Sequence, residues 1–93
     1  MNRLETAFSL HLAEKFPGES FNPQCVTLRL ANGLRYTPDF FSFRLRLCFE
    51  TKGKWIDGDS IPKLKMAAFL YPQIEFWLVW RDGGVWNEQR VLE

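Results

Sequence analysis

The segment spanning residues 44–80 constrains the fold of this 93-residue chain more than any other. Residues 44–52 alternate between polar and apolar side chains, as a strand with one buried face does. Residues 74–80 are almost continuously apolar, which is typical of a strand covered on both faces in a parallel arrangement. Between them, a stretch that starts near Ser60 and stops before Pro72 has the pattern of a helix. A strand, a helix and a second strand in this order predict a right-handed parallel crossover.

The N-terminal segment predicts a first helix over about residues 3–16. Asn2 can cap this helix, and Glu5, three residues later, completes the pattern of a capping box. Glu5 also falls inside the apolar stripe of the helix, where a carboxylate that only faces water is out of place. Two interpretations stay open: Glu5 bonds to the Asn2 backbone amide, or it points inward toward a cation.

Strand patterns fill much of the remaining chain. Residues 24–30 and 34–37 alternate in polarity, and the Asn32-Gly33 pair between them is typical of a hairpin turn. A further strand is expected near residues 40–43, and a short final strand over residues 85–87. The predicted fold class is α/β, of the α+β type with a mixed sheet: a helix, three antiparallel strands, a helix and a parallel strand.

Composition places the chain among single globular domains, because hydrophobic residues make up 46% and aromatic residues 16%. No apolar run approaches the roughly 18 to 20 residues needed to span a bilayer. The N-terminus has no signal-peptide pattern. The two cysteines, Cys25 and Cys48, are expected to be reduced thiols in a cytoplasmic protein.

Three polar residues gather at the predicted strands in a pattern that suits phosphate chemistry. Asp39 opens one strand, and Glu50 and Lys52 lie two residues apart on the next, so their side chains project from the same face. Two acids and an ammonium group at a sheet surface are suited to divalent metal and phosphate chemistry. The alternative is a surface salt bridge between Glu50 and Lys52, which leaves the other acids unexplained.

The motif Pro38-Asp39, ten residues and then Glu50-Thr51-Lys52 resembles the PD-(D/E)xK signature of restriction-endonuclease-like nucleases. Together with the flanking residues 36–40 and 49–53, it resembles the bacteriophage endonuclease I family of Holliday-junction resolvases. Leu4-Glu5 matches a Leu-Glu pair that supplies a further catalytic acid in that family. Over about residues 3–82, the resemblance implies a restriction-endonuclease-like core. It also implies a phage-encoded endonuclease that cuts branched DNA in the host cytoplasm.

The same residues suit the metal that this resemblance implies. Mg²⁺ prefers hard oxygen ligands, which Asp39, Glu50 and the Thr51 carbonyl can supply. Glu5 can complete a second site, and Mn²⁺ is expected to substitute for Mg²⁺. Lys52 can orient or help to deprotonate the attacking water and offset charge in the transition state. Two alternatives remain: a nicking or structure-nonspecific nuclease of the same fold, and a DNA-binding accessory module without catalysis.

Charge and apolar patterns predict the partners. Residues 29–65 carry a net charge of +4, whereas the rest of the chain carries −3. The candidate DNA contacts are Arg44, Arg46, Lys54, Lys63 and Lys65. Each of them also fits ordinary surface charge on a solvated sheet face. Paired cuts need two active sites, so a homodimer is expected, with Met66, Phe69 and Leu70 on the outer side of the second helix as its candidate contact.

Overall fold

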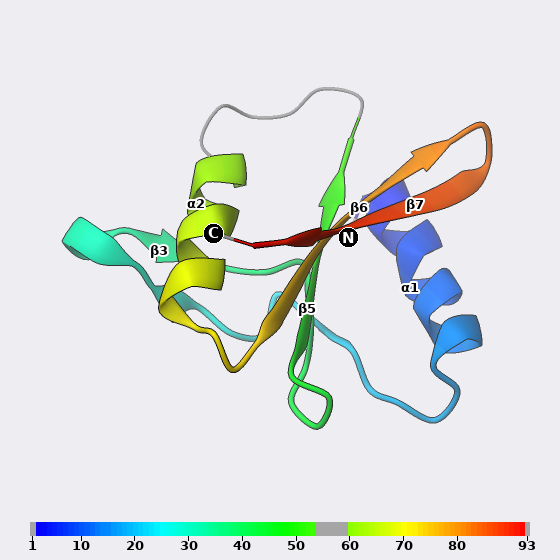
Figure 1. The fold of residues 1–93 in the computed structure, drawn as a ribbon. Coiled ribbons are helices and arrows are strands. Elements are labelled where there is room, and N and C mark those ends of the chain that lie inside the picture. The colour runs from blue at the N-terminus through cyan, green and yellow to red at the C-terminus, as the bar shows by residue number, and fades with distance from the viewer. Residues whose placement is uncertain (1, 54–59, 93) are drawn as a thin grey trace.

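The computed structural model describes residues 2–53 and 60–92 and has an α+β fold (Figure 1). Its helices are α1 (Arg3–Lys15) and α2 (Ser60–Leu70), with a 3₁₀ turn at Ala31–Gly33. The mixed five-stranded sheet has the order β1 (Asn22–Pro23), β4 (Phe40–Ser42), β5 (Leu47–Lys52), β6 (Glu75–Asp82) and β7 (Val85–Val91). A separate hairpin consists of β2 (Leu28–Arg29) and β3 (Arg35–Tyr36). The mixed sheet and the α+β class are therefore confirmed.

The two helices lie on opposite sides of the sheet (Figure 1). Phe8 and Leu12 of α1 belong to one buried cluster, which also contains Phe40, Phe49 and Val79. A second buried cluster lies on the α2 side, where the hairpin also packs; it includes Leu28, Leu30, Tyr36, Phe41, Cys48, Leu64, Ala67 and Phe76. Because side chains alternate across a strand, β5 and β6 supply residues to both clusters. The sheet is thus the middle of three layers.

The only parallel strand pair among the described residues is β5 with β6, in register from Leu47 opposite Glu75 to Lys52 opposite Trp80. α2 connects these strands in the sequence, so the predicted parallel pairing is confirmed. The buried side chains of Phe76 and Val79 explain the continuous apolar run, since they belong to different clusters. The crossover brings the end of β5 and the start of α2 to the same pocket.

The prediction of one strand over residues 44–52 is wrong at its start, because β5 begins only at Leu47. Residues 43–46 form a tight turn between β4 and β5, closed by a 2.9 Å hydrogen bond from the Arg46 amide to the Ser42 carbonyl. Arg46 has a φ of 55° in this turn. Arg44 and Arg46 therefore do not share a strand face with Glu50.

The hairpin is confirmed, but it is shorter than expected and stands outside the main sheet. The amide of Gln24 donates to the Asp39 carbonyl at 3.0 Å, which keeps this part of the chain beside the main sheet until the hairpin begins at Leu28. Asn32 adopts a φ of 58° at the turn, a conformation that asparagine tolerates well. At the other end of the chain, the final strand β7 runs to Val91, well beyond the expected residues 85–87.

The outer side of α2 is only partly as predicted. Phe69 and Leu70 are 62% and 41% exposed, whereas Met66 packs against the core cluster on the α2 side. The homodimer itself stays a prediction. Cys25 and Cys48 are free thiols. Among the residues described, no helix is long and apolar enough to cross a membrane.

Replacing Phe8 by alanine tests the packing of α1 on the sheet. Phe8 is 1% exposed, and its ring centroid lies 5.4 Å from that of Phe49 and 4.9 Å from that of Trp86. Because the substitution leaves a cavity, we expect a loss of about 3–5 kcal/mol in the free energy of unfolding, measured with urea. Leu10→Ala, at a position on the same helix that is 65% exposed, is the control and should cost less than about 1 kcal/mol. Equal losses in the two variants would contradict this packing.

Candidate functional site

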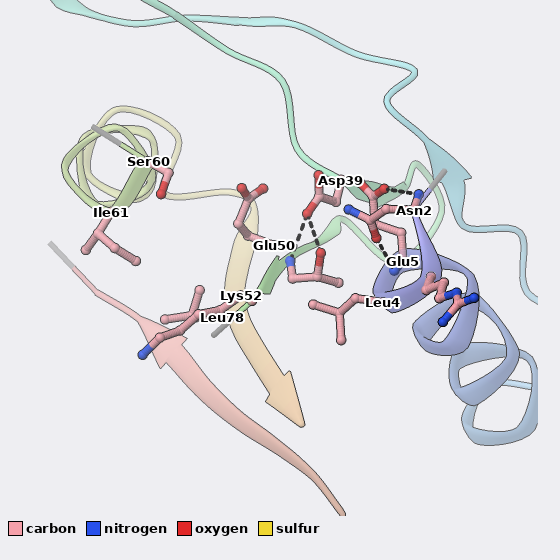
Figure 2. A pocket seen from close by; sticks show the side chains of 12 residues that line it. Asn2, Leu4, Glu5, Asp39, Glu50, Lys52, Ser60, Ile61 and Leu78 are labelled. Carbon is pink, nitrogen blue, oxygen red and sulfur yellow. Dashed lines mark hydrogen bonds between the residues drawn. The ribbon is translucent and has the colours of Figure 1, made fainter. Parts of the chain in front are cut away.

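An open pocket of about 500 Å³ lies at the C-terminal end of β5. Its walls come from the start of α1, the residue before β4, the end of β5, the start of α2 and Leu78 of β6 (Figure 2). The predicted site residues that line it are Glu5, Asp39, Glu50, Thr51 and Lys52. The fold therefore brings together all of the predicted catalytic and metal-binding residues.

Asp39 is fixed by Thr51 across the β4–β5 pair. Its Oδ2 accepts hydrogen bonds from the Thr51 amide at 2.9 Å and from the Thr51 hydroxyl at 2.7 Å. Burial raises the pKa of the Asp39 carboxyl; the Thr51 bonds act in the opposite direction, and the Glu5 carboxylate raises it further. The sequence predicted only that the Thr51 carbonyl binds the metal. The structure adds a second role, in which the Thr51 amide and hydroxyl hold the Asp39 carboxylate in place.

Glu50 lies beside Asp39 and is held by Tyr36 of the hairpin. The Tyr36 hydroxyl donates to Glu50 Oε1 at 2.7 Å. Burial raises the pKa of Glu50 to about 7, and the negative charge of Asp39 adds to this effect. Hydrogen bonds from Tyr36 and from the Asp39 backbone act against it. Glu50 thus titrates close to neutral pH.

Glu5 forms the predicted capping box and also lies against the pocket, whereas its binding of a cation stays a prediction. Its Oε2 accepts from the Asn2 amide at 2.9 Å, and its own amide donates to Asn2 Oδ1 at 2.8 Å, so the capping box is present. The side chain is nevertheless only 7% exposed and faces the pocket beside Asp39 and Glu50 (Figure 2). One carboxylate therefore caps α1 and adds negative charge to the site.

Lys52 lines the pocket, but its ammonium group points away from the acids (Figure 2). Lys52 Nζ lies 5.4 Å from the centroid of the Trp80 ring, its neighbour on β6, in a cation–π contact. Within the described chain, Lys52 forms no ion pair with Glu50. The alternative of a Glu50–Lys52 surface salt bridge is therefore wrong for this structure.

The predicted DNA contacts divide into three groups. Arg44 pairs with Glu19, and both Arg44 and Arg46 lie in the turn before β5, at the end opposite the pocket. Lys63 and Lys65 lie on α2, and Lys65 lines a hollow next to the pocket. Lys54 falls outside the described residues. Of the candidates within the described residues, only Lys65 lines a hollow that adjoins the pocket.

The donor set fits one divalent ion held by few protein ligands. Asp39 and Glu50 supply hard oxygen atoms at adjacent positions, and their raised pKa values reflect burial and crowded negative charge that a cation would offset. Across residues 2–53 and 60–92, no three His, Cys, Asp or Glu side chains group closely enough to hold a common metal. Two carboxylates, completed by water and substrate oxygen, are a usual set for Mg²⁺.

Several polar residues of the site were missed at the sequence level: Tyr36, which holds Glu50, and Gln24, whose side-chain amide donates to Glu5 Oε1 at 3.4 Å, together with the pocket-lining residues Asn2, Arg3 and Ser60. A signal existed for Tyr36, because a buried tyrosine hydroxyl usually finds a hydrogen-bond partner. Its partner could not be identified, since the hairpin and β5 pack together only in the folded chain.

Comparison with protein-family models, curated proteins and solved structures found no match. The resemblance to the bacteriophage endonuclease I family therefore stays a hypothesis.

Glu50 gives a testable pH dependence of stability. Its pKa is about 7 in the folded protein, against 4.5 for an unperturbed glutamate, so the folded state binds more protons between these limits. Stability is then lost as the pH rises through this range, by on the order of 3 kcal/mol. We expect urea unfolding in EDTA to show this decline, and Glu50→Gln to flatten it. The same decline in the variant would exclude Glu50 as the titrating group.

Proposed function

We propose that this protein is a divalent-metal-dependent DNA endonuclease that hydrolyses phosphodiester bonds. One observation carries the proposal: Asp39 and Glu50 are held side by side in an open pocket, both with raised pKa values, and Lys52 lies at its edge. Neighbouring carboxylates repel each other when both are ionised, and a bound divalent cation would offset this repulsion.

Asp39 and Glu50 would hold the ion, with the Thr51 carbonyl as a third ligand and Glu5 as an acid available to a second ion. A divalent ion bound there supplies positive charge that stabilises the transition state and makes a water molecule easier to deprotonate. The hydrogen bonds from Thr51 to Asp39 and from Tyr36 to Glu50 fix both carboxylates before any ligand arrives. Because these hydrogen bonds already hold the two carboxylates in place, the carboxylates need to move little when the ion binds.

Lys52 would act on the phosphate or on the attacking water. Its ammonium group lies over Trp80, and the flexible four-carbon stem allows it to leave the ring and turn into the pocket. There it would offset the negative charge that develops on the phosphate oxygens. Trp80 thus stabilises a resting position of the lysine.

Branched DNA is the proposed substrate, on the basis of the resemblance of residues 36–40 and 49–53 to junction resolvases. Two cuts in opposite strands would require two copies of the pocket, which a homodimer supplies. The exposed side chains of Phe69 and Leu70 are available for such a contact. A nicking nuclease and a DNA-binding accessory module remain the alternatives.

A cleavage assay separates these functions. The protein would be incubated with a four-way junction, nicked duplex, linear duplex and single strands, in Mg²⁺, Mn²⁺ or EDTA. Symmetric, metal-dependent cutting of the junction supports the resolvase. Nicking of all duplexes supports the nonspecific nuclease. Binding without cutting in either metal would contradict the proposed activity and favour the accessory module.

Substitutions in the pocket should remove cleavage without unfolding the protein. We expect Asp39→Asn and Lys52→Ala each to lower the cleavage rate at least about 100-fold, because they remove a ligand and a charge that act in the transition state. Glu14→Gln, at an exposed position on α1 outside the pocket, is the control and should cleave at the wild-type rate. Full activity of Lys52→Ala would overturn the role of Lys52.

A further inference from the structure

Another hollow adjoins the pocket that holds the acids, at the end of β5 and β6. It has a volume of about 460 Å³. The residues that line both this hollow and the pocket are Leu4, Lys52 and Gly53, so the two are continuous. The rest of its lining is Trp80, Arg81 and Asp82 of β6. A DNA strand with one phosphate at the acids therefore has room for its next nucleotide in this hollow.

Trp80 is the aromatic residue of this hollow, and it is not part of the buried core. Of the tryptophans within residues 2–53 and 60–92, Trp77 and Trp86 pack against the cluster on the α1 side. Trp80 is outside both buried clusters and is only half-buried. Arg81 turns to the other side of the sheet, where its guanidinium lies 5.5 Å from the centroid of the Trp86 ring. The ring of Trp80 is thus left to the hollow.

The contact of Trp80 with Lys52 shows that this ring has an accessible face. Lys52 Nζ lies over the ring, 5.4 Å from its centroid, and the two residues are register partners on β5 and β6. In the proposed mechanism, the ammonium group leaves the ring and turns toward the phosphate. The same movement uncovers the ring face for a ligand in the hollow.

We propose that Trp80 stacks on an unpaired nucleobase of the DNA substrate, next to the phosphate at the acids. The ligand in this inference rests on the proposed function. Every base has an aromatic face, and stacking on a tryptophan ring strengthens binding by about 5- to 150-fold per base. A base inside a duplex already stacks on its neighbours, whereas a base at a branch point or in a single strand is turned out at lower cost. Stacking on Trp80 would therefore favour branched DNA over fully paired DNA.

The test uses two single strands that carry the same number of phosphates: an ordinary oligonucleotide and one of equal length made of abasic nucleotides. Trp80→Leu removes the aromatic face, and Trp80→Phe keeps one. Phe43→Leu is the matched control, because Phe43 is 62% exposed, lies in the turn before β5 and lines neither the pocket nor the hollow. Binding of fluorescent strands would be measured by anisotropy in EDTA, with thermal unfolding to confirm that each variant is folded.

We expect the wild type to bind the ordinary strand at least about fivefold more tightly than the abasic strand. Trp80→Leu should lose this preference and still bind the abasic strand as the wild type does, whereas Trp80→Phe and Phe43→Leu should keep it. Equal binding of the two strands by the wild type, or an unchanged preference in Trp80→Leu, would overturn the inference. Trp80 would then serve only to hold Lys52.

Photo-crosslinking of the wild type to a strand that contains bromouracil gives the same answer without a variant. Mass spectrometry of the crosslinked peptides should locate the base at Trp80, and crosslinks found only at other residues would overturn the inference. Because EDTA prevents cleavage, both results are independent of activity. A base preference in a protein that cuts no DNA would contradict the proposed function alone, and cleavage without a base preference would contradict this inference alone.

Discussion

The structure depends on the stabilisation of three neighbouring carboxylates at the end of β5. Glu5, Asp39 and Glu50 lie close together, so holding their negative charges at this buried site is costly: burial raises the pKa of Asp39 and of Glu50, and the neighbouring carboxylates raise both further. Hydrogen bonds from Asn2, Thr51 and Tyr36 offset part of that cost. The part of the electrostatic cost that these hydrogen bonds do not offset is what a bound cation would remove.

Each layer of the fold delivers one part of this arrangement. The start of α1 supplies Glu5 through its capping box, and the hairpin on the α2 side supplies Tyr36. The antiparallel β4–β5 pair places Asp39 against Thr51. The parallel crossover then leaves the end of β5 open toward the start of α2.

The features of the fold that depend on local sequence patterns were predicted correctly. Alternation and capping residues located both helices and the parallel pair, and the spacing of Asp39, Glu50 and Lys52 identified residues that share one pocket. Contacts between segments distant in sequence were not predictable. The bond from Tyr36 to Glu50 depends on how the hairpin packs, and the position of Lys52 over Trp80 depends on strand register. Arg44 and Arg46 were placed on a strand because alternation does not distinguish a strand from the tight turn that precedes it.

Direct measurement of divalent-ion binding tests the central claim. Isothermal titration calorimetry with Mn²⁺ and then Mg²⁺ at about pH 8, where Glu50 is largely ionised, would use the wild type and Asp39→Asn without DNA. We predict saturable binding to the wild type and at least about tenfold weaker binding to the variant. No binding to the wild type, or equal binding to both proteins, would contradict a metal site at these carboxylates.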